Sequence, residues 1–272
     1  MPTGVTAALL RLVRGRLDPW PLAAARIGLA AAALLKSADL AMVMPEIAAP
    51  GTLRLPHPWS PLPPLAPAAA WCLPAAAALA AIALALGWHA RLAAAALAAA
   101  LGTALAADRQ LYSNHLLLLV VLVAMLALTD CGAARSLDAR RRGRTPDAVT
   151  AWPARLLQTQ LTAVYAFAAL SKLNADFLSG AVLAVHLGPP AAPEPVGTDL
   201  LAALAAAAVA TEAFLAVALW LPRLRPAAFV VGAGFHLAIL VSMEPALPFA
   251  VFGLAALAVY PLYAARAAAA PA

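Results

Sequence analysis

Long apolar stretches constrain this chain more than any other feature of its sequence. They lie at 20–43, 66–87, 90–107, 113–131, 153–173, 198–221, 226–243 and 247–265, separated by charges, Pro and Gly. A run of about 20 apolar residues is long enough to cross a hydrocarbon core of roughly 30 Å as a helix. The chain is 65% hydrophobic and 11% charged, with a mean hydropathy of +0.88, so no stretch is left over for a soluble domain. The sequence predicts an all-α integral membrane protein, with about eight transmembrane helices in one bundle and one domain over residues 1–272.

The arginines predict the orientation of this bundle. If the N-terminus is cytoplasmic, 13 of the 16 arginines fall in inner segments, whereas only Arg54 and Arg109 fall outside. Basic loops resist translocation, so this asymmetry favours two cytoplasmic termini in a multi-pass protein of the cell membrane. The formal net charge of +6 is explained by topology, and nucleic acid is not expected as a partner. The first run resembles a signal peptide in position, but its charges, Arg26, Lys36 and Asp39, favour a retained span.

Two outer connections are long enough to carry structure, and one inner loop is strongly basic. Segment 44–65 contains seven prolines, which favours an extended outer cap over a helix. In the outer segment 174–197, the apolar part 177–187 is too short to span and is expected to form a re-entrant or interfacial helix. The inner loop 132–152 carries five arginines and is typical of a stop-transfer signal and an anchor to anionic lipid.

The two cysteines give no sign of a metal site. Cys72 is expected near the outer end of the second span and Cys131 near the inner end of the fourth. Most of the membrane thickness then separates them, which excludes a disulfide between them. Two isolated cysteines have no metal-binding spacing, so we expect no metal.

Lysine is rare here and occurs where a charge is costly. The chain has 16 arginines but only Lys36 and Lys172, each within or at the end of an apolar run. A desolvated lysine can lose its proton near neutral pH and act as a base, whereas guanidinium stays charged. Lys36 and Asp39, at i and i+3, are expected to form a structural ion pair. Arg26 lies deeper in the same span and is expected to bond backbone carbonyls or an acid.

Polar residues form a stripe on the fifth span that ends at Lys172. Gln158, Thr162, Tyr165, Ala169 and Lys172 recur at the spacing of one helical face. Lipid cannot satisfy polar groups, so this face is predicted to point to the bundle interior or a cavity. The alternative for Lys172 is that its amine extends to the headgroups and only anchors the helix end.

Four further polar residues are expected in or near the same leaflet. Asn114 and His115 open the fourth span at its outer edge, Glu212 lies in the sixth span, and His236 lies near the middle of the seventh. Each of these could be a structural hydrogen-bonder between helices. Together with Lys172 they predict a pocket in the outer leaflet.

Several motifs resemble the HTTM domain, the membrane half of vitamin K-dependent gamma-carboxylase and of many bacterial relatives. The motifs are Asn114-His115 before an apolar span, Ser136-Leu137-Asp138-Ala139-Arg140-Arg141-Arg142, Ser171-Lys172-Leu173-Asn174-Ala175-Asp176-Phe177, Glu212-Ala213-Phe214 and Phe235-His236-Leu237. The resemblance covers most of the chain and is strongest over 108–180. Order, spacing and predicted depth agree with the family pattern.

The resemblance implies roles for the polar residues. Lys172 would be the catalytic base that deprotonates a vitamin K-type quinol such as menaquinol, after which oxygen adds and the strong base so formed removes a glutamate proton before carbon dioxide enters. His115, with Asn114, would hydrogen-bond near the quinone oxygens. His236 would help line the pocket. Tyr165 and Glu212 are expected in the same pocket from the polar stripe and their predicted depth.

The chain also departs from the family pattern. Ser171 stands where the animal enzyme has a second Lys, and Asn174 and Phe177 replace Asp and Trp. The large luminal part of the carboxylase, which holds its protein substrate, has no counterpart after Arg266. Carboxylation of a tethered protein by this chain alone is therefore not expected.

Two function hypotheses follow, and the sequence leaves both open. The first is a carboxylase-like or quinol-handling oxidoreductase that binds a quinone. The second is a non-enzymatic membrane factor that assists maturation or export of a secreted partner protein, a role also implied by short members of the family. It would require an exposed surface, such as segment 174–197. A transporter is a further alternative, although an inverted-repeat transporter gains no support, because the chain shows no internal repeat.

The arginine asymmetry can be tested by accessibility in intact cells. A cysteine placed in loop 132–152 is expected to be shielded from a membrane-impermeant thiol reagent, while one placed in 189–197 is expected to be labelled. The opposite labelling pattern would overturn the orientation and every depth assigned from it.

Overall fold

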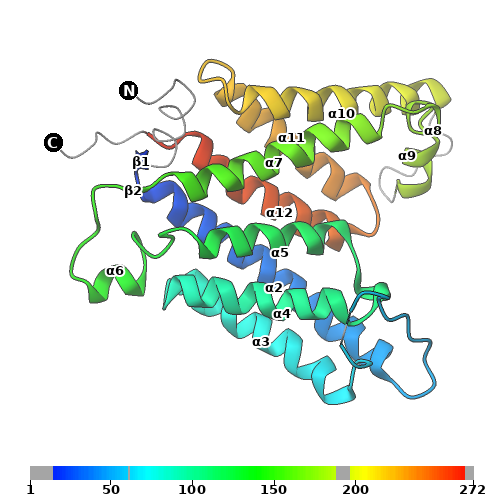
Figure 1. The fold of residues 1–272 in the computed structure, drawn as a ribbon. Coiled ribbons are helices and arrows are strands. Elements are labelled where there is room, and N and C mark those ends of the chain that lie inside the picture. Colours follow the sequence, from blue (N-terminus) through cyan, green and yellow to red (C-terminus); the bar gives the residue numbers. More distant parts are fainter. Residues whose placement is uncertain (1–14, 61, 188–196, 267–272) are drawn as a thin grey trace, which may run out of the picture. The chain divides into compact units, whose positions relative to one another are not determined.

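The computed structural model describes residues 15–60, 62–187 and 197–266, and these are almost entirely helical (Figure 1). The α-helices are α2 (Trp20–Ala48), α3 (Pro67–Leu86), α4 (Ala90–Ala107), α5 (Asn114–Ala127), α6 (Leu137–Arg141), α7 (Trp152–Ser171), α8 (Ala175–Leu178), α9 (Ala181–His186), α10 (Thr198–Ala218), α11 (Arg225–Ser242) and α12 (Ala246–Tyr263). A short 3-10 helix η1 (Arg109–Leu111) and the antiparallel strands β1 (Arg16–Leu17) and β2 (Val149–Thr150) complete the described elements. The prediction of an all-α protein is confirmed.

Each predicted span coincides with one helix. Six helices are long and apolar enough to cross a membrane, namely α2, α3, α4, α10, α11 and α12, so the chain is a multi-pass membrane protein. Helix α7 is continuous over 20 residues, but the polar residues of its stripe lower its hydropathy. It is therefore not among the six. Helix α5 has 14 residues and ends at Ala127, short of the predicted 131, because Thr129 caps the last turn by donating to the Leu126 carbonyl. Eight spans and the orientation of the termini remain predictions.

The chain divides into two compact units, which are described separately. Unit 1 comprises residues 1–157 and 265–272, and unit 2 comprises residues 158–264. The boundary falls within α7. The prediction of a single bundle and a single domain is not tested by this division and stays a prediction.

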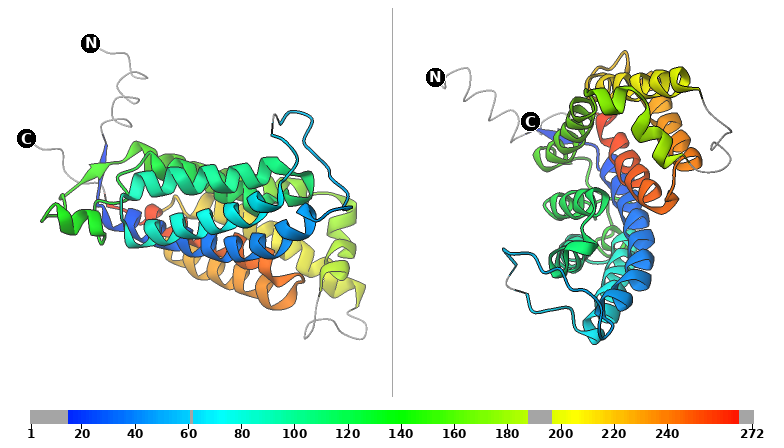
Figure 2. Two further views of the ribbon diagram at one scale, coloured as in Figure 1. Left: turned by 90° about the horizontal axis from the view of Figure 1, so that it is seen from below. Right: turned by 90° about the vertical axis from the view of Figure 1, so that its right-hand side faces the viewer.

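In unit 1, four helices lie side by side (Figure 2). Helix α2 packs against α3 and α5, and α4 packs against both α3 and α5. Their contacts are rich in buried alanines such as Ala33, Ala81 and Ala94, whose small side chains allow helices to approach closely without help from a hydrophobic driving force. At one end of the unit, β1 pairs with β2, with Arg16 opposite Thr150.

The Pro-rich segment begins later than the sequence predicted. Helix α2 continues through Pro45 to Ala48, so the expectation of extended structure from residue 44 is wrong for the first five residues. Proline has a helical φ and here forgoes a single backbone hydrogen bond close to the helix end. The described residues after it are not helical, as expected. Arg54 holds them in place by donating to the carbonyls of Ala48 and Leu65, at 2.8 and 2.7 Å.

Arg26 holds the loop that follows α5 in place. Its hydrogen bonds confirm the prediction that Arg26 bonds backbone carbonyls. Its side chain is fully buried in α2 and donates to the backbone oxygens of Cys131 at 2.8 Å, Ala134 at 3.2 Å and Arg135 at 2.6 Å. A longer contact of 3.5 Å reaches the Ala85 oxygen at the end of α3. These carbonyls lie beyond regular helix and cannot bond lipid, so the guanidinium satisfies them.

In unit 2, α11 packs against both α10 and α12, and two short helices cover part of α10. Helices α8 and α9 meet at Gly180, where φ is +82° and a Cβ atom would lie 2.4 Å from the Leu201 Cβ. Phe177 and Leu183 pack there against Leu201 and Ala205. The apolar part of segment 174–197 therefore forms two helices packed on protein, instead of the single re-entrant or interfacial helix that was expected.

Some sequence predictions fall on residues that the structure does not describe. They include the inner arginines Arg11 and Arg14, and residues 189–196 of the proposed labelling site. The structure describes Cys72 as exposed and Cys131 as buried, both as free thiols.

Replacing Arg26 tests whether the carbonyl clamp stabilises unit 1. Arg26→Gln is expected to lower stability by about 3 kcal/mol, because several buried carbonyls lose their donor. The measurement is the midpoint of thermal unfolding in a mild detergent. The control is Arg91→Gln, whose side chain is 61% exposed and whose contact with Asp130 is 4.0 Å long, so a loss under about 1 kcal/mol is expected. Equal losses in the two variants would contradict the clamp.

Candidate functional site

The polar stripe of α7 faces the interior of unit 2, as its spacing predicted. Gln158, Tyr165 and Ala169 are buried, and the polar side chains of the stripe bond to groups on or next to α10, α11 and α12. A helix with this many polar groups is stable in lipid because neighbouring helices take up their hydrogen bonds. The stripe contains three successive clusters.

The first cluster joins the beginning of the stripe to α12. The Gln158 amide donates to the Leu262 carbonyl at 2.8 Å, and the Tyr263 hydroxyl donates back to the Gln158 carbonyl at 2.7 Å. Thr162 Oγ1 lies 3.1 Å from the Tyr263 hydroxyl and accepts from the Trp220 indole at 2.7 Å. These reciprocal bonds fix the rotation of α7 about its axis.

The second cluster is a buried arrangement of two tyrosines and a histidine. The Tyr165 hydroxyl lies 2.8 Å from His236 Nε2 on α11 and 2.8 Å from the Tyr260 hydroxyl on α12. All three side chains are at least 95% buried. Gly232, one helical turn before His236, leaves the space that the Tyr260 hydroxyl occupies, since a Cβ there would lie 2.0 Å from that oxygen. A continuous donor and acceptor chain of this kind can hold or relay a proton.

The third cluster is an ion pair at the end of the stripe. Lys172 Nζ contacts both carboxylate oxygens of Glu212 on α10, at 2.5 and 2.6 Å. The Glu212 side chain is 8% exposed and that of Lys172 is 27% exposed. The amine also lies 5.7 Å from the centre of the Phe177 ring, within the range of a cation–π contact. The Lys172 amine is thus held by protein groups, in contrast to the alternative in which it only reaches the headgroups.

Local chain geometry sets the direction of Lys172. Helix α7 ends at Ser171, and Asn174 then turns the chain by capping α8. The Asn174 side chain accepts from the Phe177 amide and donates to the Ser171 carbonyl, both at 2.9 Å. Lys172 therefore sits on a short, tied corner between two helices.

The remaining predicted site residues belong to unit 1. His115 Nε2 lies 3.2 Å from the Ser113 hydroxyl, and the Asn114 side chain accepts from the Tyr112 hydroxyl at 3.1 Å. Lys36 and Asp39 form the predicted ion pair at 2.5 Å. Because unit 1 and unit 2 are described separately, the convergence of His115 on Lys172 and His236 stays a prediction.

Sequence reasoning missed three members of the polar clusters. Tyr260 and Tyr263 are three residues apart on one face of α12, a spacing that could have drawn attention to them. Trp220 gave no comparable signal, because it follows α10 and is typical of a residue at a membrane interface.

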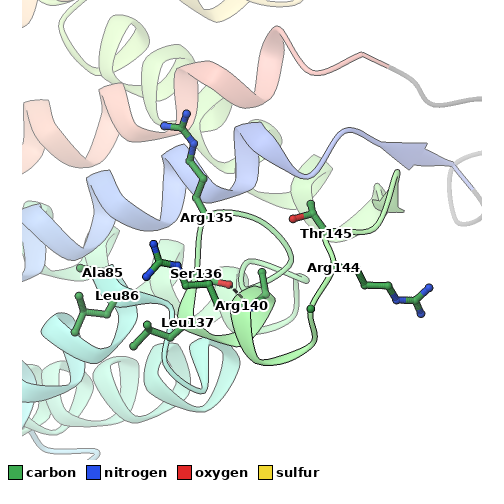
Figure 3. A pocket seen from close by; sticks show the side chains of 10 residues that line it. Ala85, Leu86, Arg135, Ser136, Leu137, Arg140, Arg144 and Thr145 are labelled. Carbon is green, nitrogen blue, oxygen red and sulfur yellow. Dashed lines mark hydrogen bonds between the residues drawn. The ribbon is translucent and has the colours of Figure 1, made fainter.

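Two open pockets are lined by residues of unit 1 and share no residue with the three clusters. The larger has a volume of about 680 Å³ and is bordered by the end of α3 and by residues 135–145 (Figure 3). The second, of about 370 Å³, is bordered by Arg16, Arg91, Asp130, Asp138 and Arg142 among others. Neither is the predicted outer-leaflet pocket, which stays a prediction. Within the described ranges, no group of three His, Cys, Asp or Glu side chains could hold a metal ion.

Comparison with protein families decides the relationship of the chain. The HTTM domain matches residues 17–266. The chain belongs to the HTTM family. The match covers nearly the whole sequence and confirms the resemblance that the motifs indicated. No curated protein and no solved structure matches this HTTM protein significantly.

The tyrosine and histidine cluster predicts a measurable stabilisation. Tyr165→Phe removes the hydroxyl that bonds both His236 and Tyr260. The buried imidazole and the buried Tyr260 hydroxyl each lose a hydrogen-bond partner. We expect a loss of about 2 kcal/mol, read as a lower midpoint of thermal unfolding in detergent. Tyr112→Phe is the matched control, since Tyr112 is 50% exposed and its loss should be below about 0.5 kcal/mol. If the Tyr165→Phe protein is as stable as the control, the hydrogen bonds of Tyr165 do not stabilise the fold and the prediction is wrong.

Proposed function

We propose that this HTTM protein handles a quinol in the membrane, with Lys172 and Glu212 as its proton-accepting centre. The observation that carries the proposal is the contact of one amine with both oxygens of a carboxylate that is 8% exposed. A lysine that only anchors a helix end would gain little from such a pairing. The desolvation free energy of the buried carboxylate exceeds the stabilisation from a partly exposed ion pair. Costly ionisable pairs in membrane helices are typical of functional sites.

The pair supplies a base through its shared proton. In surroundings of low polarity, a lysine and a glutamate can exist as an ion pair or as a neutral amine and carboxylic acid. When the proton rests on Glu212, the Lys172 amine has a lone pair and can accept a proton from a substrate hydroxyl. Glu212 therefore acts as a positioning residue for the amine.

The donor set fits a vitamin K-type quinol such as menaquinol. The site combines a base with a buried hydroxyl and imidazole, and its surroundings are apolar. When bound, a quinol supplies an acidic hydroxyl and two reducing electrons. Tyr165 lies in α7 seven residues before Lys172, which directly follows the helix, so the two are roughly 10 Å apart along its axis. Tyr165 and His236 would line the pocket on the inner side of the base, consistent with the role that the family resemblance implies for His236.

We also infer that the protein has eight spans in one bundle, with both termini in the cytoplasm. Helix α7 is included because its polar face is satisfied within unit 2, so only its apolar faces would meet lipid. Helix α5 is included because apolar residues line it throughout after His115. The arginine asymmetry supports the orientation.

A second candidate function is supported by exposed apolar residues beside Lys172. Leu173 is 58% exposed, Val182 38% and Val185 80%, all in the predicted outer segment. Such residues outside a span suit contact with a partner protein. The protein would then be a non-enzymatic factor for maturation or export of a secreted protein, and the Lys172–Glu212 pair would be structural.

Replacing lysine by arginine separates the two functions. Lys172→Arg keeps the charge and can still pair with Glu212, but it removes the proton acceptor. We expect turnover of a reduced quinone with oxygen by the purified protein to fall about a hundredfold or more, with thermal stability unchanged. Lys36→Arg is the matched control, because Lys36 is the other lysine and is paired with Asp39 in unit 1, and it should retain activity.

The outcome in cells gives a second measurement. Complementation of a deletion strain by Lys172→Arg, together with failure by Val185→Asp, would reject the base and favour the maturation factor. Full quinol turnover by the Lys172→Arg protein would have the same consequence.

A further inference from the structure

The larger pocket of unit 1 has the chemistry of an anion site. Arg135, Arg140 and Arg144 border it, together with the hydroxyl residue Thr145, and no Asp or Glu is among the described residues that line it. Its volume of about 680 Å³ lies within the range of roughly 300–1,000 Å³ found for small-molecule sites. Guanidinium groups match phosphate in both charge and geometry. Three arginines in the lining, with no Asp or Glu among the described lining residues, therefore favour an anionic ligand such as a phosphate.

Two of the lining arginines extend their side chains away from the centre of the pocket. Figure 3 shows the Arg135 side chain extending toward α2, while that of Arg144 points away from the end of α3. The Arg135 guanidinium lies 3.7 Å above the Trp20 ring, which holds it at one side.

The walls of the pocket are fixed from within the protein. Arg26 binds the carbonyls of Arg135 and Ala85, so one buried side chain links both walls. Gly87, just after α3, approaches Ser136 so closely that a Cβ atom would lie 2.2 Å from the Ser136 Cβ. The Asp138 amide donates to the Gly87 carbonyl at 3.0 Å. The pocket is thus preformed, which reduces the entropy lost when a ligand binds.

The surroundings of the pocket place it at the level of lipid headgroups. It lies where the apolar helix α3 ends, and Leu86 in its wall is 54% exposed. Trp20 and Trp88, 46% and 47% exposed, flank this end of the helices. Tryptophans at the ends of spans mark the membrane interface, and basic pockets there bind anionic headgroups. The exposed Leu86 continues the pocket wall toward the acyl chains, which a free phosphate would not use.

We propose that this pocket binds the phosphate of an anionic phospholipid headgroup, on the side of the membrane predicted to be cytoplasmic. The site goes beyond the proposed quinol function, because it lies in unit 1 and shares no residue with Lys172, Glu212, Tyr165 or His236. It assigns to part of the inner loop a defined lipid site in place of a diffuse attraction between charges.

The test is binding of phosphatidylglycerol to the full-length protein in a neutral detergent, measured by native mass spectrometry. The pocket variant is Arg140→Gln with Arg144→Gln, because both side chains are exposed and their loss should not affect folding. The control variant is Arg141→Gln with Arg223→Gln, which removes the same charge from exposed positions that do not line the pocket. We expect the pocket variant to bind about thirtyfold more weakly and the control to bind within about threefold of the original. Unchanged unfolding midpoints show that both variants are folded.

Three results would overturn the proposal. Equal weakening in the two variants would mean a general attraction of the basic surface. Equal binding of phosphatidylcholine and phosphatidylglycerol would mean that the anionic headgroup is not selected. Displacement of the lipid by millimolar inorganic phosphate, with no preference for the lipid, would mean that the pocket takes free phosphate. Loss of quinol turnover in Lys172→Arg with lipid binding retained would leave this site in place, so the two proposals can fail independently.

Discussion

The hydrocarbon core offers no hydrogen bonds, and the polar architecture of this protein follows from that constraint. Every polar group within the spans must find a partner in the protein. In unit 1, Arg26 meets this requirement for the carbonyls of the loop after α5. In unit 2, the stripe on α7 meets it through α10, α11 and α12. In each unit, a few buried polar side chains fix elements that apolar packing alone would leave free to slide or rotate.

The Arg26 hydrogen bonds and the polar clusters along α7 differ in whether their groups can transfer protons. The Arg26 guanidinium is fully buried and stays charged, so it can only hold its carbonyls in place. The groups along α7 can exchange protons, since they include two tyrosines, a histidine, a lysine and a glutamate. The first arrangement suits a structural clamp beneath a preformed pocket, and the second suits chemistry on protons. This difference is why the proposed quinol site lies in unit 2 and the proposed lipid site in unit 1.

The chain belongs to the HTTM family over both units, since the match spans residues 17–266. The residues around Lys172 fix its position. Asn174 ties the corner that carries the lysine, and Phe177 packs under its amine while also joining the apolar cluster on α10. Asn174 caps α8, because its amide oxygen accepts a hydrogen bond from the Phe177 amide.

The sequence alone determined the helical class, the positions of the eight long helices and the face of α7 that points inward. These follow from local properties, namely the length of apolar runs and the 3.6-residue period, which do not depend on partners far along the chain. The Lys36–Asp39 pair was predictable for the same reason. The tertiary structure alone decided which carboxylate holds Lys172, that Tyr165 bonds both His236 and Tyr260, and that Arg26 takes the carbonyls near Cys131. Each of these contacts joins residues 40 to 108 positions apart, and a single sequence does not encode which distant helices become neighbours. The course of α2 through Pro45 was likewise decided by context, because a helix can tolerate the loss of one hydrogen bond where packing continues to hold it.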